Sequence, residues 1–134
     1  DTVVCLNVLE HVKDPRVALA NMHRALAPGG RLVLYVPQGA SLYSSLDEVL
    51  GHRCRYEKAQ LAAELQAAGF AVESFRDFNR ASVPGWFWNG RVLKRREFGR
   101  LQLKLFNLLV PLVRLLDRLL PWRGLGIIAV ATRS

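Results

Sequence analysis

Four short apolar stretches recur along the chain, and each has the pattern of a β-strand. Thr2–Leu6 is β-branched and almost wholly apolar, which predicts a strand buried on both faces of a parallel sheet. Residues 31–36 form a second apolar strand, residues 70–75 alternate between apolar and polar positions, and residues 126–132 form the last strand. We therefore expect these four segments to build one sheet.

Two segments between these strands have the periodicity of helices. The first begins at Asp14-Pro15, because aspartate suits the N-cap and proline suits the first turn. It ends before the Pro-Gly-Gly turn at residues 28–30. The second covers residues 57–68 and ends at a glycine, and residues 46–50 allow a short helix. Alternating strands and helices predict an α/β sheet with right-handed crossovers.

Residues 77–122 interrupt this alternation, and we interpret them as a helical and aromatic insert within one domain. The segment holds the run PGWFWNG, a basic cluster and a leucine-rich helix at residues 98–120. Pro111 is expected to kink that helix or to split it in two. One narrow, mainly polar stripe runs along this otherwise apolar helix. Its members recur every three or four positions: Arg100, Lys104, Asn107, Pro111, Arg114 and Arg118.

Composition allows one domain or less, because the chain has 134 residues, of which 51% are hydrophobic. Residues 91–118 carry eight basic side chains against two acidic ones, which leaves +6 of the net charge of +8 in this short segment. Charge concentrated in this way indicates a local partner. No run of about 18 to 20 apolar residues predicts a spanning helix. The first strand begins at once, without a leader, as expected of a chain that starts within a domain.

The two cysteines have neither a disulfide framework nor the spacing of a metal site, and they fit a reducing cytoplasm. Cys5 lies in an apolar strand and is expected to be a small core residue. Cys54 lies between two arginines, which would favour its thiolate if the side chain is exposed.

Three stretches occur in an order that resembles a known family: DTVVCLNVLEHVKDP, LAPGGRLVLYVP and HRCRYEKAQLAAELQAAGF. They resemble the C-terminal half of class I S-adenosylmethionine-dependent methyltransferases, over residues 1–76 and 124–132. The resemblance implies an incomplete Rossmann-like sheet, with residues 126–132 as its last, antiparallel strand. The insert resembles a bacterial subgroup, some members of which are fused to a glycosyltransferase and act on lipid-linked sugars.

The family's glycine-rich cofactor turn is missing, because no Gly-x-Gly-x-Gly occurs in these residues. The resemblance therefore implies that about a hundred further residues precede this chain. It also implies S-adenosylmethionine as the cofactor and a small-molecule or lipid-linked acceptor. We expect residues 1–134 to be the C-terminal part of one methyltransferase domain and to be inactive alone.

The resemblance places Leu6 and Asn7 against the methionine part of the cofactor, at the carboxyl end of the first strand. For Leu6, plain core packing is the alternative. His11 is the best candidate for a general base, because the free pKa of histidine is near neutral. Glu10 could orient His11, bind an acceptor hydroxyl or hold a cation, which makes the pair the candidate catalytic residues.

A metal site is not expected from this pair. In some related quinone-pathway methyltransferases the matching Glu-His pair helps bind a divalent metal, together with a glutamate three residues earlier. That position is Asn7 here, and hard cations prefer several oxygens. The structural alternative is that Glu10 caps the next helix and His11 packs under a loop.

The acceptor is expected to meet residues near GHRCRY and at the edge of the insert. The arginines could hold a phosphate or carboxylate, and the loop tyrosine could close over the site. The alternative is that the arginines face solvent and that the second tyrosine staples the start of the helix. The candidate acceptor-binding residues are Tyr43, His52, Arg53, Arg55, Tyr56, Asn79 and Trp86.

The leucine-rich helix at 98–120 leaves the choice of partner open. Its aromatic and basic surroundings fit an anionic membrane surface, and its wide apolar face fits a homodimer equally well. Nucleic acid is disfavoured, because a helix so apolar makes a poor solvated surface. The alternative to an enzyme is a non-catalytic interaction module, which would use this basic, leucine-rich insert to bind a membrane, a protein or nucleic acid. We expect a cytoplasmic protein, with membrane association left open.

Overall fold

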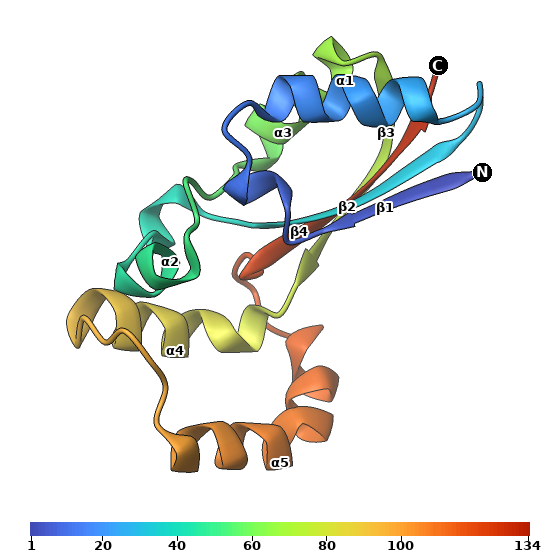
Figure 1. The fold of residues 1–134 in the computed structure, drawn as a ribbon. Helices are drawn as coiled ribbons and strands as arrows, with labels where there is room; N and C mark the ends of the chain where they lie inside the picture. The colour runs from blue at the N-terminus through green and yellow to red at the C-terminus, as the bar shows by residue number, and fades with distance from the viewer.

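The computed structural model describes residues 1–134 and contains one mixed sheet of four strands (Figure 1). The strands are β1 (Thr2–Leu6), β2 (Arg31–Pro37), β3 (Phe70–Phe78) and β4 (Gly126–Arg133). Their order is β1-β2-β4-β3, with β1 parallel to β2 and β4 antiparallel to both of its neighbours. The α/β fold, the four strands and the antiparallel last strand are therefore confirmed.

Helices α1 (Pro15–Ala25) and α3 (Lys58–Ala67) cover the same face of the sheet (Figure 1). Asp14 caps α1, since its carboxylate accepts the backbone N–H groups of Arg16 and Val17. Leucines of both helices pack against alternate residues of β2 and β4. The fully covered side chains of this core include Leu19, Leu32, Leu34, Leu61, Leu65 and Ile127.

The opposite face of the sheet carries no helix of this chain. On β1, Cys5 is buried, whereas Val4 is 61% and Leu6 is 53% exposed. The prediction that this strand is buried on both faces is therefore wrong for this structure. β1 lies at the sheet edge, and α1 and α3 protect only the side chains that point toward them.

Short elements connect the sheet to its ends. A 3₁₀ turn, η1 (Leu9–His11), follows β1, and another, η2 (Ala40–Leu42), follows β2. Helix α2 (Ser45–Leu50) begins with a capping box, in which Ser44 and Asp47 satisfy each other's backbone N–H groups. Gly51 then ends α2 at φ 74°, a left-handed conformation that glycine adopts without strain.

The segment between β3 and β4 lies beyond one end of the sheet, away from α1 and α3 (Figure 1). It contains η3 (Arg80–Ser82), α4 (Val83–Phe87), a π-helical turn η4 (Trp88–Val92) and α5 (Arg100–Asp117). Helix α5 continues through Pro111 and changes direction partway along, so it is bent and not split.

No residue of α5 is buried. Its leucines reach high exposure, with Leu101 at 81% and Leu108 at 76%. At its C-terminal end, Asp117 accepts the backbone N–H of Ala81 at 2.8 Å, which ties α5 to η3. None of the helices has both the length and the apolar composition that crossing a bilayer would require.

Candidate active site

A cavity of about 340 Å³ opens at the carboxyl ends of β1 and β2. These strands are parallel, so the segments that follow them leave the sheet at the same edge. The loop after α2 and the segment after β3 complete the wall. The lining residues are Asn7, His11, Tyr35, Pro37, Leu50, His52, Arg55, Trp86 and Leu125.

Asn7 turns the chain out of β1 and into the cavity wall. Its φ of 52° is in the left-handed region, which asparagine tolerates better than most residues with a side chain. Its backbone N–H donates to the carbonyl of Tyr35 at 3.1 Å, which fixes the turn against β2. Of the two residues expected to contact the cofactor, Asn7 therefore lines the cavity, whereas Leu6 lies on the uncovered surface of the sheet and does not.

Glu10 is a fully buried carboxylate to which nothing in the chain donates a hydrogen bond. Its Oε1 lies 3.9 Å from Nε2 of His11 and 3.9 Å from Nε2 of His52. Glu10 does not cap the next helix, because Asp14 does so. A buried, unsatisfied carboxylate is costly, so its position calls for a partner that brings positive charge or a proton.

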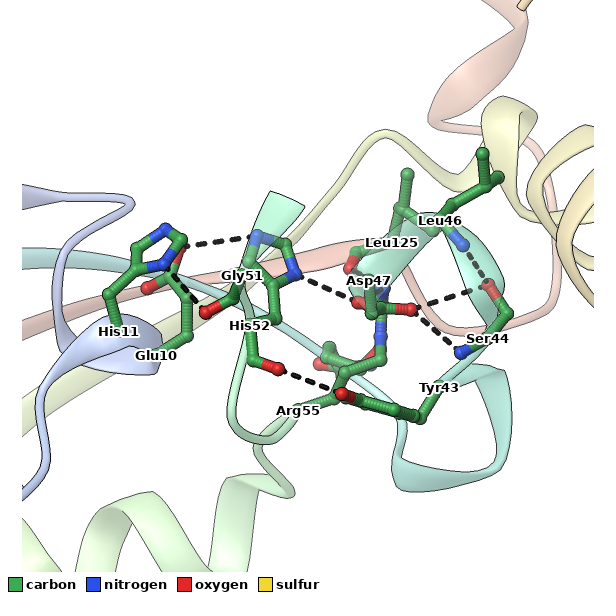
Figure 2. Close-up of polar contacts among 11 residues, drawn as sticks. Glu10, His11, Tyr43, Ser44, Leu46, Asp47, Gly51, His52, Arg55 and Leu125 are labelled. Carbon is green, nitrogen blue, oxygen red and sulfur yellow. Dashed lines mark hydrogen bonds and ion pairs between the residues drawn. The ribbon is translucent and has the colours of Figure 1, made fainter. Parts of the chain in front are cut away.

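The hydrogen bonds of the two histidines fix which ring nitrogen carries the proton (Figure 2). Nδ1 of His11 lies 3.0 Å from the carbonyl of Gly51, and Nδ1 of His52 lies 2.8 Å from a carboxylate oxygen of Asp47. Both partners are acceptors, so each Nδ1 is the donor. In the neutral form of each ring, Nε2 therefore carries the lone pair, 3.9 Å from Oε1 of Glu10.

A buried ion pair supports His52 from behind. Arg55 donates from one terminal nitrogen to Asp47 at 2.8 Å, and the pair is almost completely buried. Arg55 also donates to the carbonyls of Gln38 and Leu125, each at 2.9 Å, and its guanidinium lies over the ring of Trp86. Arg55 thus holds four segments of the chain together, and three of its N–H groups are used in doing so.

The other predicted acceptor residues fall into different places. The hydroxyl of Tyr43 donates to the backbone carbonyl of His52 at 2.8 Å and so braces the loop that carries this histidine. Arg53 is exposed and donates to the carbonyl of His11 at 3.2 Å. Tyr56 is 1% exposed within the core and does not line the cavity. Burial raises the pKa of its phenol.

A second cavity of about 300 Å³ lies between α4 and α5. Asn79 and Trp86, both expected near the acceptor, line it. Trp86 and Leu125 line both cavities, so the two cavities lie next to each other. The lining is mainly apolar and consists of Asn79, Ala81, Ser82, Gly85, Trp86, Asn89, Phe98, Gln102, Leu103, Phe106 and Leu125.

Several residues of the site escaped the sequence analysis. The spacing Ser-x-x-Asp indicates that Asp47 belongs to a capping box, but no sequence pattern indicates its hydrogen bond to His52. Tyr35 alternates with buried residues of β2 and lines the cavity. Burial raises the pKa of its phenol, so the group keeps its proton near neutral pH. Its ring occupies the place that a side chain at position 126 would need, which explains Gly126.

The expectation for Cys54 is revised by its surroundings. Burial is the main influence on its pKa, which lies above the ordinary value despite the flanking arginines. Cys54 is partly buried and packs against the core. The thiol form, and not the thiolate, is favoured.

Comparison with known proteins gives one family and one fold. A family model described as a methyltransferase domain matches residues 1–74. No curated protein matches the chain. Among solved structures, the S-adenosylmethionine-dependent methyltransferase of Mesorhizobium loti is similar at a TM-score of 0.62 and 15% identity, with 99% of this chain and 62% of that chain covered.

Two further solved structures show how widely this fold is used. Phosphoethanolamine N-methyltransferase 2 of Haemonchus contortus, in complex with S-adenosylmethionine, has a TM-score of 0.55 and 17% identity over 98% of this chain and 33% of that one. The [4+2]-cyclase SpnF has a TM-score of 0.57 and 21% identity over 99% and 49%. The chain spans less than two thirds of each of these structures, and likeness at such identity shows the fold alone.

Proposed function

This chain belongs to the methyltransferase domain family, and from that premise we propose that it is part of an S-adenosylmethionine-dependent methyltransferase that acts on a small-molecule or lipid-linked acceptor. The observation that carries the proposal is the cavity at the carboxyl ends of β1 and β2, where Nε2 of His11 lies 3.9 Å from the buried carboxylate of Glu10. Sheets of this type hold their ligands at this edge.

The residues present fit one part of the cofactor. Asn7 and Tyr35 bring polar groups to the cavity at the carboxyl ends of β1 and β2, where the methionine portion would lie. The 134 residues contain no glycine-rich turn to receive the rest, so we propose that they bind the cofactor weakly and are inactive alone. When bound, S-adenosylmethionine supplies an electrophilic methyl group.

His11 is the proposed acceptor of the substrate's proton. Its Nδ1 is held by the carbonyl of Gly51, so Nε2 is the nitrogen that is free to act as a base. The side chain is 40% exposed and lines the cavity, within reach of a bound hydroxyl or amine. Glu10, 3.9 Å from Nε2, stabilises the imidazolium that forms when His11 takes the proton.

The two adjacent cavities support an amphiphilic acceptor. The first is lined by histidines, a tyrosine and an arginine, whereas the second is mainly apolar. Trp86 and Leu125 separate them and contact both. We propose that the reacting polar end of the acceptor lies near His11 and that an apolar portion lies between α4 and α5.

Helix α5 supports a proposal about location. Its leucines are uncovered, and Arg100, Lys104 and Arg114 lie along the same helix. We propose that α5 rests on an anionic membrane surface and presents the second cavity to lipid-linked acceptors. Sedimentation with anionic and with neutral vesicles tests this, and a protein that ignores both but forms dimers would assign α5 to a second copy.

The function is tested first on the coding DNA. An in-frame extension upstream of the codon for Asp1, with a strand, a glycine-rich turn and an acidic residue about 20 positions further on, would support the proposal. A start codon directly before Asp1, preceded by a stop codon, would contradict it. The non-catalytic interaction module would then be the better description.

A methyl-transfer assay on the extended protein is the second test. With labelled S-adenosylmethionine, His11→Gln should lower kcat at least about a hundredfold, as loss of a general base does. His23→Gln is the matched control, because His23 lies against Phe70 and outside the cavity. Equal activity of the two variants would remove His11 from the mechanism.

A further inference from the structure

Three groups that can ligate a metal ion converge beside the cavity, and no hydrogen bond joins Glu10 to either histidine. The ligand atoms of Glu10, His11 and His52 lie within 4.8 Å of one another. Both Nδ1 atoms lie against acceptors (Figure 2), and both Nε2 atoms lie 3.9 Å from Oε1 of Glu10. Such a cluster offers a cation three ligand atoms.

The balance of charge around Glu10 leads to the same conclusion. Glu10 is fully buried, and neither of its carboxylate oxygens has a partner. The neighbouring carboxylate, Asp47, is neutralised by Arg55. The side chain of Arg53 turns instead to the carbonyl of His11. The chain therefore supplies three possible ligands, and no lysine or arginine side chain pairs with the buried carboxylate of Glu10.

We propose that Glu10, His11 and His52 bind a divalent transition-metal ion, with Zn²⁺ as the best match. Two imidazole nitrogens and one carboxylate oxygen are ligands that such ions prefer. Mg²⁺ and Ca²⁺ prefer a shell of oxygens, which this cluster does not offer. The site differs from the metal site of the quinone-pathway methyltransferases, which uses a glutamate at the position of Asn7. Its third ligand is instead His52, 42 residues after Glu10.

The ligand atoms, which lie within 4.8 Å of one another, would have to draw together around the ion. Ligands in a tetrahedral zinc site lie about 3.3 Å from one another, as bond lengths near 2.0–2.1 Å require. The present separations from Glu10 Oε1 to the two Nε2 atoms are 3.9 Å. Gly51 and Asp47 hold the Nδ1 atoms from behind, as the outer hydrogen bonds of metal-binding histidines do. The cavity provides room for a fourth, exchangeable ligand.

The ion would change the role of His11 in the proposed reaction. With the ion bound, Nε2 of His11 would be a ligand, so the role of base proposed above would belong to the metal-free site. The ion would supply Lewis acidity at its open position, so that an acceptor hydroxyl there could release its proton to solvent water. This consequence rests on the proposed methyl transfer, whereas metal binding itself rests only on the cluster.

The first test needs no variant. Tag-free, metal-stripped protein is titrated with Co²⁺, which absorbs visible light strongly in a low-symmetry site of few ligands, and with Zn²⁺ in a calorimeter. We expect one ion per chain, displacement of Co²⁺ by Zn²⁺, and no displacement by millimolar Mg²⁺. A wild-type protein that shows neither a cobalt spectrum nor heat of zinc binding overturns the proposal.

Matched variants assign the ligands. Glu10→Gln and His52→Gln should each weaken zinc binding at least about tenfold, and His23→Gln should leave it unchanged. Far-UV circular dichroism identifies any variant that does not fold, in which case the wild-type titration decides. Equal affinity of all three variants would place the ion elsewhere and overturn the assignment. Because no cofactor or acceptor is present, these results stand apart from the methyl-transfer assay.

Discussion

The covered face of the sheet and helix α5 are both rich in leucine, yet only the first is buried. Leu34 in β2 and Leu61 in α3 are 0% exposed, whereas Leu101 and Leu108 in α5 are 81% and 76% exposed. The first set has partners in this chain because α1 and α3 pack on the sheet. A leucine-rich segment is therefore not necessarily part of the core. The leucines packed between the sheet and its helices should contribute more to the free energy of unfolding than those of α5.

Two carboxylates give the largest expected contrast. Asp47→Ala leaves the buried guanidinium of Arg55 without its counter-charge, which should cost about 3–5 kcal/mol of unfolding free energy. Asp117→Ala in α5 removes one hydrogen bond, to the N–H of Ala81, and should cost about 1 kcal/mol. Urea denaturation followed by circular dichroism measures both. Equal losses would show that α5 is as firmly anchored as the sheet.

One leucine in the sheet and one in α5 allow the same comparison with uncharged side chains. Leu34→Ala empties a fully buried position in the middle of the sheet and should cost about 2–5 kcal/mol. Leu108→Ala on exposed α5 should change the unfolding free energy by no more than about 0.5 kcal/mol. The same denaturation experiment applies, and a larger loss for Leu108→Ala would mean that α5 is covered in solution.

The junction between the two regions should respond to pH through Asp77. Burial raises the pKa of this carboxyl, but hydrogen bonds from Lys58, the N–H of Gly124 and Gln38 outweigh burial and lower the pKa to about 2. A lowered pKa in the folded state stabilises the protein above the unfolded pKa near 4, and this stabilisation is lost as pH falls toward 2. Its size is about 2 kcal/mol.

Asp77→Asn tests this contribution. At pH 7 the variant should unfold at lower urea concentration than the wild type, and the difference should shrink as pH falls from 4 to 2. Urea titrations at a series of pH values measure the difference. A difference that stays constant with pH would show that the carboxylate charge contributes nothing, and that only the shape of the side chain does.

The smallest effect on the sheet is expected from Pro111→Ala. Alanine restores a backbone donor within α5 and removes the ring that bends the helix, so helical signal should rise. No residue of α5 is buried. The unfolding free energy should therefore change by less than it does in Leu108→Ala. A clear rise in that midpoint would show that the bend couples α5 to the rest of the domain.

Much of the fold could be predicted from local sequence. Alternating apolar positions and the Asp14-Pro15 cap predicted the strands and the first long helix, because these signals act over a few residues. The uncovered Val4 and Leu6 could not be predicted from the same pattern. Apolarity shows that a side chain favours burial, and it does not show which face of a sheet a helix will cover.

The candidate site also has features that the sequence predicts and features that depend on the fold. The sequence by itself determined that a glutamate and a histidine, Glu10 and His11, follow the first strand, and that the chain carries the pattern of a methyltransferase. Only the tertiary structure decided that His52 faces the same carboxylate and that Asp47 sets its tautomer. Contacts between residues some 40 positions apart depend on how strands and loops pack, and no local pattern encodes that distance.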